Sequence, residues 1–202
     1  MPIQLITLVG RNISMALVAE YGLDSPPRRL LLLALSLKDR MQQRKMDKFH
    51  IQKVIRYYEY LRNRPLEVDF SNYDMGGVSY EIHENAETLE EYGLIERKGD
   101  YYLLTDEGER AANEIKRAFS KDDLQKFAFS KFQLNDLSLD EAMYFMYMMV
   151  PETRQHSAHF TSLEKKNAVL VRSLYVKGRI NSVTASKWLG ISEKEFESWL
   201  SK

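Results

Sequence analysis

Two short apolar runs on either side of a glycine turn constrain the fold of this chain more than any other feature. The runs occupy residues 94–97 and 101–104, and Lys98-Gly99-Asp100 separates them. This pattern predicts a β-hairpin with strands near 94–97 and 101–104. Helical patterns precede and follow the hairpin, so we expect a mainly α fold that carries one small β element.

Capping residues and apolar spacing predict the elements around the hairpin. We expect helices that begin at Pro26, after Asp47, near Ser79 and after Thr105, and the third of these ends at Gly93. Residues 66–70 alternate apolar and polar side chains, which predicts a strand. Helix, helix, strand, helix, hairpin and helix is the order of a winged helix-turn-helix, with the hairpin as the wing.

The C-terminal half has its own signals. Ser138 and Glu141 form a capping-box pattern that opens an almost wholly apolar helix ending at Pro151. We expect a linker over 153–162 and a long helix over 163–177. Residues 183–199 have the spacing of a helix-turn-helix, with Ser186 where the two helices cross and Gly190 in the turn.

These patterns predict three parts: a winged helix-turn-helix domain over residues 1–119, a helical connector over 120–160 and a C-terminal helix-turn-helix over 161–202. The expected fold class is therefore mainly α with a small β-hairpin wing.

Composition excludes several kinds of chemistry. The chain has no cysteine, which rules out disulfides, thiol nucleophiles and Cys-based zinc sites. The four histidines lack the spacing of metal ligands, and no phosphate-cradling glycine loop is present. We expect no metal site, no cofactor and no enzymatic activity. Without a signal-peptide pattern or a long apolar run, we expect a cytoplasmic protein with no membrane span.

Charge is divided unevenly along a chain that is neutral as a whole, with 29 Lys and Arg against 29 Asp and Glu. Residues 1–65 hold 12 basic and 5 acidic side chains (12 − 5 = +7). Residues 66–110 hold 3 and 13 (3 − 13 = −10), and residues 111–202 hold 14 and 11 (14 − 11 = +3). Any contact with nucleic acid must therefore be local.

Two stretches resemble known families. Phe49 to Ile115, with its segments 50–55, 75–79, 89–95 and 102–108, resembles the winged-helix antitoxin-like domains of the Panacea type and their archaeal and bacterial relatives. The usual Gly-Pro of their loop is Gly76-Gly77 here. Residues 137–152 look like a tail segment of such proteins, and 174–200 are similar to small helix-turn-helix antitoxins that neutralise nuclease toxins. The resemblance implies a transcriptional regulator or an antitoxin-like protein.

Clusters of basic side chains predict a surface that binds double-stranded DNA. One cluster lies in and around the first two helices of the winged domain, at Lys38, Arg40, Arg44, Lys45, Lys48, Lys53 and Arg56. Arg97 and Lys98 lie at the tip of the wing, where basic residues commonly touch phosphate. Thr184, Lys187 and Ser192 are candidate phosphate contacts in the C-terminal unit. Ordinary surface charge on helices is the competing interpretation.

The helices that would normally read DNA argue against such contact. The helix before the wing carries Glu81, Glu84, Glu87, Glu90 and Glu91 and no Lys or Arg, and the last helix is also rich in glutamate. The leading hypothesis is a DNA-binding transcriptional regulator. The alternative is a protein-interaction module on a winged-helix scaffold, with a partner such as a toxin and no DNA contact.

The apolar helix at 139–150 bears on oligomeric state. Its apolar residues lie on nearly all sides, more than one core-facing stripe needs, and regulators of this kind often read two half-sites. We therefore expect at least a homodimer. Full burial of this helix within one chain is the alternative.

Overall fold

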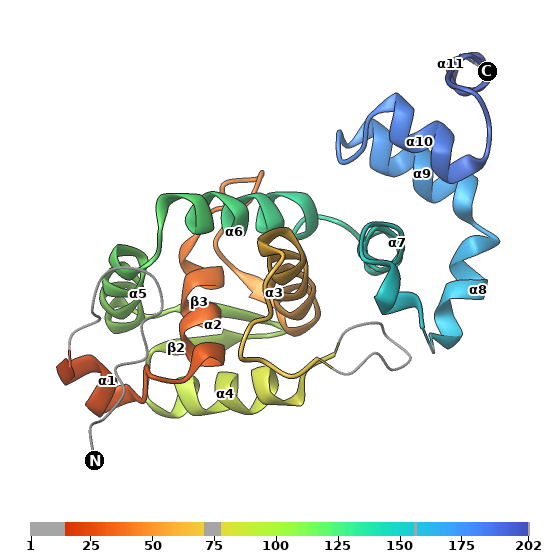
Figure 1. Ribbon diagram of the computed structural model, residues 1–202. Coiled ribbons are helices and arrows are strands. Elements are labelled where there is room, and N and C mark those ends of the chain that lie inside the picture. The colour runs from red at the N-terminus through yellow and green to blue at the C-terminus, as the bar shows by residue number, and fades with distance from the viewer. Residues whose placement is uncertain (1–14, 71–77, 156, 202) are drawn as a thin grey trace. The chain divides into compact units, whose positions relative to one another are not determined.

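A computed structural model describes residues 15–70, 78–155 and 157–201, and this part of the chain is mainly helical with a small antiparallel sheet (Figure 1). The α-helices, with the short 3-10 helix η1, are α1 Met15–Tyr21, α2 Pro26–Ser36, α3 Lys48–Arg62, α4 Tyr80–Glu91, α5 Asp106–Ala118, α6 Lys121–Leu134, α7 Leu139–Met149, η1 Pro151–Arg154, α8 Ala158–Glu164, α9 Asn167–Val176, α10 Ser182–Leu189 and α11 Glu193–Leu200. The strands are β1 Met46–Asp47, β2 Ile95–Lys98 and β3 Tyr101–Leu104. None of the described helices has the length and apolar character needed to span a membrane.

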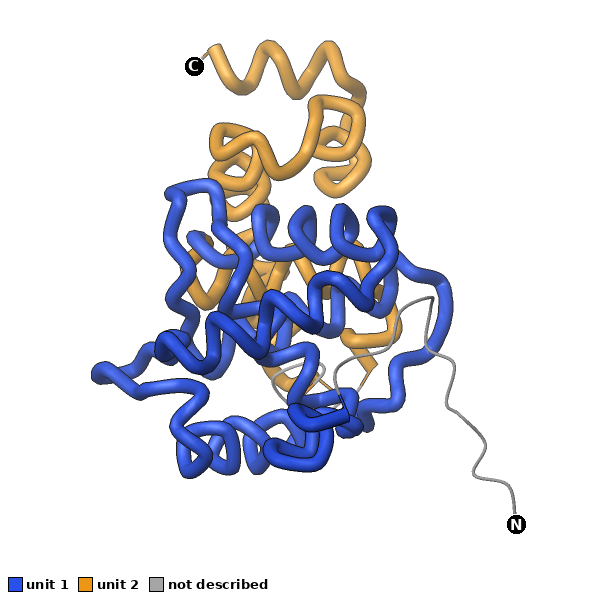
Figure 2. Tube along the Cα trace, turned by 90° about the vertical axis from the view of Figure 1, so that its left-hand side faces the viewer, with its two compact units in different colours: residues 1–70, 79–136 blue, residues 71–78, 137–202 orange. Residues whose placement is uncertain are grey.

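The chain forms two compact units, coloured separately in Figure 2. The first ends at Asp136, and the main part of the second begins at Leu137. This division differs from the predicted boundaries at 119 and 160. The reason is packing: α6 lies along α3 in the first unit, while α7 packs against α8 and α9 in the second.

The leucine-rich helix α2 is the core of the first unit. Residues 30–35 are all buried, and α2 packs against α3, α4, α5 and α6, which surround it in Figure 1. A helix that is apolar on every side has to be covered on every side. The run of leucines therefore organises the unit around α2.

The predicted hairpin is confirmed. β2 and β3 pair antiparallel, with Lys98 opposite Tyr101 and the left-handed Gly99 (φ 62°) in the turn. A third strand, β1, pairs with the other side of β3, which gives the sheet the order β1-β3-β2.

The predicted strand at 66–70 is wrong. In this segment the amide of Leu66 donates to Glu59 Oε1 (2.9 Å) and the amide of Asp69 donates to Glu81 Oε2 (3.3 Å). The backbone is thus tied to helix side chains, and Val68 is buried. The alternating pattern came from burial of an extended loop and not from a sheet.

Three predicted helix starts are confirmed by their capping geometry. The side chains of Asp47, Thr105 and Ser138 accept hydrogen bonds from the backbone amides of residues 50, 108 and 141. Ser138 and Glu141 form the complete capping box. Capping patterns of this kind predict helix starts well, because the side chain accepts from a backbone amide at the same helix end that would otherwise have no partner.

The expected linker and long helix before residue 177 are wrong. The linker region contains η1 and the first part of α8, and the long helix is two helices, α8 and α9. Although α8 looks polar, it is held to α7. The ring of Phe160 lies 5.6 Å from that of Tyr147, whose hydroxyl is 2.5 Å from the Ser157 hydroxyl.

Helix α7 is buried in its own chain. Residues 141–147 are all buried, and the rings of Tyr144 and Phe145 lie 6.0 and 6.4 Å from Trp188 of α10. This is the alternative to the burial in a dimer that the sequence left open, so α7 no longer argues for a homodimer. The oligomeric state itself stays a prediction.

The C-terminal helices follow the predicted pattern. Helices α10 and α11 are separated by residues 190–192, and Gly190 has the left-handed conformation expected of the turn (φ 68°). Ser186, where the helices were expected to cross, is buried, as are Ala185 and Phe196.

Glu141 ties α7 to α9 in the second unit. Its carboxylate accepts from the Ser138 amide (2.7 Å), from the Ser173 hydroxyl and from Lys177 Nζ (2.6 Å). Burial raises the pKa of Glu141, but the hydrogen bonds from Lys177, Ser173 and Ser138 outweigh it and lower the pKa to about 2. The folded protein therefore stabilises the charged carboxylate form of Glu141.

Replacing this carboxylate should change how stability depends on pH. Since the folded pKa lies below that of the unfolded chain, the stability that Glu141 contributes is complete above about pH 4.5 and is lost as pH falls toward 2. We expect Glu141→Gln to lower the free energy of unfolding at pH 7 by about 1–3 kcal/mol. The deficit relative to wild type should shrink between pH 4.5 and 2 in urea titrations followed by circular dichroism.

Glu195→Gln is the matched control. Glu195 holds the same capping-box position on α11 but is exposed. Glu195→Gln should lower the free energy of unfolding at pH 7 by less than Glu141→Gln does. Equal pH profiles for Glu141→Gln and wild type would contradict the assignment.

Candidate nucleic-acid interface

A buried lysine in α6 anchors the loop that carries most of the predicted basic cluster. Lys131 is 0% exposed, and its Nζ donates to the carbonyl oxygens of Ala34 (2.8 Å), Leu37 (2.7 Å) and Arg44 (2.7 Å). An ammonium group has three N–H donors, and here three carbonyls accept. Burial lowers the pKa of Lys131 to about 7. Lys131 thereby fixes the end of α2 and both ends of the following loop to α6.

This loop, residues 37–45, is here called the basic loop, and it is also braced internally. Asp39 and Gln43 exchange two hydrogen bonds, from the Asp39 amide to the Gln43 carbonyl (2.8 Å) and from the Gln43 amide to Asp39 Oδ1 (2.7 Å). Asn135 Nδ2 donates to Asp39 Oδ2 (2.6 Å) and to the Lys45 carbonyl (3.2 Å). The loop is therefore held in one shape at both ends and in its middle.

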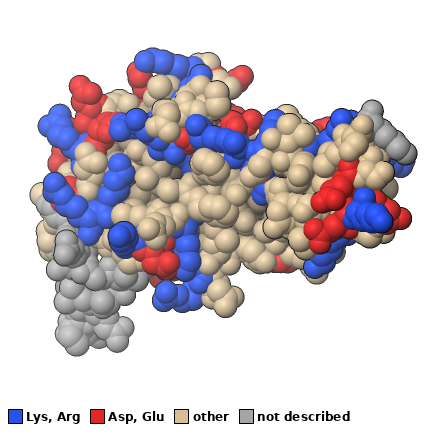
Figure 3. Space-filling model, turned by 90° about the horizontal axis from the view of Figure 1, so that it is seen from above, with Lys and Arg blue, Asp and Glu red and all other residues tan. Residues whose placement is uncertain are grey.

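The four basic side chains of the loop point outward. Lys38, Arg40, Arg44 and Lys45 are all exposed. Two of them lie over partly exposed rings: the Arg40 guanidinium is 5.6 Å from the Phe132 ring centre, and Lys45 Nζ is 4.6 Å from that of Tyr101. Figure 3, which looks down on the α6 side, shows Lys and Arg side chains gathered over this face of the first unit, with acidic groups among them.

The small sheet connects the basic loop to the hairpin. β1 follows the loop directly, and Asp47 of β1 lies opposite Tyr101 of β3, which lies opposite Lys98 of β2. Lys48 follows β1 on the side of the hairpin turn and is exposed. The basic loop enters β1 at the end away from the turn, where Arg44 pairs with Glu109 of α5, and the side chain of Lys45 reaches over the Tyr101 ring. The structure thus joins two parts of the predicted site that are about 50 residues apart in sequence.

The two basic residues of the tip are exposed but engaged. Lys98 Nζ forms an ion pair with Glu96 (2.6 Å), and Arg97 Nε donates to the Gly99 carbonyl (3.1 Å). Arg44 of the loop pairs with Glu109. Exposed pairs of this kind are weak and exchange readily, so they leave these cations available to an anionic ligand.

Lys53 is a correction to the predicted cluster. It is 1% exposed, and its Nζ lies 4.9 Å from the Phe49 ring centre. Burial lowers its pKa to about 7. The sequence counted Lys53 as surface charge because it did not reveal that α3 is covered on most sides. Arg56, its neighbour in the cluster, is partly buried and paired with Glu59.

The C-terminal candidates lie in the other unit. Lys187 is exposed on α10, whereas Ser192 caps α11, with its hydroxyl accepting from the Glu195 amide (3.2 Å). Thr184 is half-buried, and its amide donates to Asn181 Oδ1 (2.8 Å). Glu193, Glu195 and Glu197 are exposed on α11. This group belongs to the second unit, whereas the basic loop belongs to the first, and acidic side chains lie next to it on α11.

The acidic helix α4 presents its glutamates to solvent as expected. Ile82, Ala86 and Leu89 form its buried face. Glu84, Glu87, Glu90 and Glu91 are exposed, and His83 Nε2 lies 3.4 Å from Glu87. Because α4 ends where β2 begins, the far end of β2 at Lys98 lies about 10 Å from that junction. The C-terminal end of α4 and the hairpin tip therefore lie at opposite ends of β2, while α4 itself packs along this strand.

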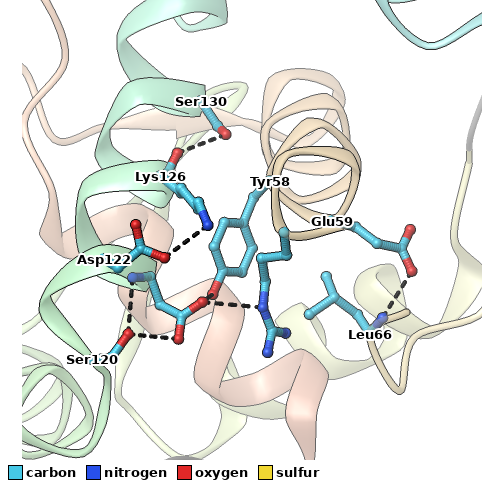
Figure 4. Close-up of polar contacts among 9 residues, drawn as sticks. Tyr58, Glu59, Leu66, Ser120, Asp122, Lys126 and Ser130 are labelled. Carbon is cyan, nitrogen blue, oxygen red and sulfur yellow. Dashed lines mark hydrogen bonds and ion pairs between the residues drawn. The ribbon is translucent and has the colours of Figure 1, made fainter. Parts of the chain in front are cut away.

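A second buried network holds the other end of α6 (Figure 4). Tyr58 Oη donates to Asp123 Oδ1 (3.2 Å), Arg62 forms an ion pair with the same carboxylate (3.1 Å), and the Ser120 hydroxyl donates to Asp123 Oδ2 (2.8 Å). Burial raises the pKa of Tyr58 well above its ordinary value. With Asp123 near its start and Lys131 near its end, α6 is a fixed support for the basic loop.

The sequence interpretation missed the supporting residues Lys131, Asn135 and Asp39. A signal was present for Lys131, since it lies four residues after Phe127 and three before Leu134, both buried. A charged residue at an inner position of a helix needs partners. The tyrosines of α3 and β3 differ in burial: Tyr57, Tyr58 and Tyr102 are buried, while Tyr60 and Tyr101 are partly exposed.

Replacing Lys131 tests the support. Lys131→Met keeps most of the side-chain volume but leaves three carbonyls without their donor, so we expect a loss of about 2–4 kcal/mol in stability. Amide hydrogen exchange should also accelerate across the basic loop. Lys126→Met, on an exposed turn of the same helix with an ion pair to Asp122, is the control and should change neither quantity appreciably. Unchanged exchange in the loop would refute the anchoring role.

No family model, curated protein or solved structure matches this chain. Among the described residues, no group of three or more His, Asp or Glu side chains is placed to hold a metal ion. The geometry of the first unit is therefore the basis from which a function can be inferred.

Proposed function

We propose that this protein is a DNA-binding transcriptional regulator whose first unit is a winged helix-turn-helix. In support, the order α2, β1, α3, α4, β2 and β3 is that of a winged helix, with β1 in place of the strand expected at 66–70. The observation that carries the proposal is the braced basic loop, whose Lys45 side chain reaches over Tyr101 beside the hairpin turn. That surface offers duplex DNA several cations in a fixed arrangement.

A fixed loop suits phosphate binding for an energetic reason. Ordering a loop upon binding costs free energy for every side chain and backbone segment immobilised. Lys131 and Asn135 have already ordered the basic loop in the free protein. The attraction between cations and phosphates, with release of counterions from DNA, then contributes to affinity with little of this cost.

In this arrangement the duplex lies along the basic loop and the hairpin tip. The glutamates of α4 repel phosphate, so α4 does not enter the major groove in the usual way of a recognition helix. Contacts to phosphate position a protein but carry no sequence information directly. Specificity then comes from the few side chains that reach base edges and from DNA shape.

The second candidate function is protein binding on the same scaffold, without DNA. The exposed glutamates of α4 favour it, because this helix carries no Lys or Arg and its carboxylates complement a basic partner such as a nuclease toxin. An antitoxin-like protein would combine both surfaces.

The basic loop can be tested by salt titration of DNA binding. We expect a gel-shift or anisotropy signal with duplex genomic fragments that weakens with salt, with a slope near −0.9 per phosphate contact. Lys38→Ala and Arg40→Ala, and likewise Arg97→Ala and Lys98→Ala at the tip, should each weaken binding to all sequences and flatten the slope by roughly one. Lys121→Ala, an exposed lysine at the other end of α6, is the control. Absence of binding at low salt would end the proposal.

Substitutions in the acidic helix α4 distinguish DNA binding from protein binding. If DNA lies along the basic loop, Glu84→Gln and Glu91→Gln should leave DNA affinity unchanged or raise it, because each removes a charge that repels phosphate. If α4 is a protein-binding surface, the same substitutions should weaken the complex with the partner, and the substitutions at the tip should be silent. Weaker DNA binding by the glutamine variants would contradict the proposed path of the duplex.

A further inference from the structure

The outer side of α9 in the second unit is an open groove with no role in the proposed DNA contact. The groove has a volume of about 430 Å³ and is lined along α9 and by one residue of α11. Its lining includes Val169, Arg172, Ser173, Val176, Lys177 and Trp199. All of these residues belong to one compact unit.

Two valines make this surface unusual. Val169 and Val176 are each 72% exposed and lie seven residues apart, which places them on the same side of α9, two turns or about 10 Å from each other. The other side of α9 already supplies Leu170, Val171 and Leu174 to the core. Helix α9 is therefore apolar on the side facing the core and again on the side facing solvent, and exposed apolar grooves of this kind mark interaction sites.

The charges in the groove are all of one sign. Arg172 and Lys177 are its charged lining residues, and neither Asp nor Glu is among them. The Arg172 guanidinium lies 5.6 Å from the Trp199 ring centre, between the two valines in sequence. Lys177 is held by Glu141, so Arg172 is the charge placed to meet a ligand. An apolar stripe with a cation beside it, midway along its length, fits an apolar partner that carries carboxylates at its flanks.

A second copy of the chain fits this groove poorly. If two α9 helices packed antiparallel about a twofold axis, Val169 of one would meet Val176 of the other, and the axis would pass close to Arg172. The two guanidinium groups would then face each other within an apolar contact, which is unfavourable. The charge pattern favours a different chain.

We propose that the α9 groove binds an amphipathic helix of another protein, with an apolar stripe at i, i+3 or i+4 and i+7 and with acidic residues beside that stripe. The spacing of Val169 and Val176 matches two turns of such a helix. Arg172 pairs with a flanking carboxylate while Trp199 covers the apolar stripe. The proposal is independent of DNA binding, because none of its residues belongs to the basic loop or the hairpin tip.

Fluorescence anisotropy with the full chain tests this assignment. The probe is a labelled 18-residue alanine-based helical peptide with leucines at i, i+4 and i+7 and glutamates beside them, compared with the same peptide carrying lysines in place of the glutamates. The glutamate peptide should bind and the lysine peptide should bind at least tenfold more weakly. Val169→Ser with Val176→Ser should weaken binding of the glutamate peptide about tenfold or more. Arg172→Glu should reverse the preference between the peptides.

Val183→Ser is the matched control, because Val183 is also exposed but lies on α10 outside the groove. It should leave peptide affinity unchanged, and circular dichroism should show every variant folded. Failure of the glutamate peptide to bind, equal binding of both peptides, or indifference to the valine substitutions would overturn the assignment. So would a dimer in light scattering that the valine substitutions dissociate, since a second copy would then be the occupant.

Discussion

The arrangement of the first unit depends on one ammonium group placed where water does not reach. Lys131 donates to carbonyls at the end of α2 and at the end of the basic loop, which lie 97 and 87 residues before it in sequence. The last carbonyls of a helix lack partners within the helix, and a cation near them is favoured by the helix dipole. Lys131 thus provides hydrogen-bond donors for carbonyls at the C-terminal end of α2, and the same ammonium group holds the basic loop in place.

The rest of the unit supports that contact. Asp123, held by Tyr58 and Arg62, secures the beginning of α6 on α3, so that Lys131 reaches the loop from a rigid helix. The loop then runs directly into β1, and pairing of β1 with β3 sets Lys45 over Tyr101. A continuous series of contacts therefore connects the core of the unit to the charged side chains at its surface.

Charge is sorted in space as well as in sequence. The basic loop lies on the α6 side of the first unit, and the exposed glutamates lie on α4 at the opposite side (Figure 1). This separation lets a neutral chain present a locally basic surface to DNA, as proposed, while keeping an acidic surface for other contacts. The α9 groove adds an apolar surface on the second unit, so the proposed contacts use different chemistry in different places.

Local interactions determined what the sequence could establish. The N-caps at Asp47, Thr105 and Ser138, the turns at Gly99 and Gly190, and the hairpin itself depend on residues close together in the chain, and all are as expected. The same holds for the buried face of α4 and for the outward-facing cations at Lys38, Arg40 and Lys45.

Contacts between distant residues decided the rest. The alternation at 66–70 was read as a strand, but the amides there bond to Glu59 and Glu81. Lys53 and Lys131 look like surface charge in the sequence, and only the packing of α3 and α6 shows that both are buried. Whether a charge faces water or carbonyls depends on which helix covers it, and that is set by the tertiary fold because burial is a property of neighbours far apart in the chain.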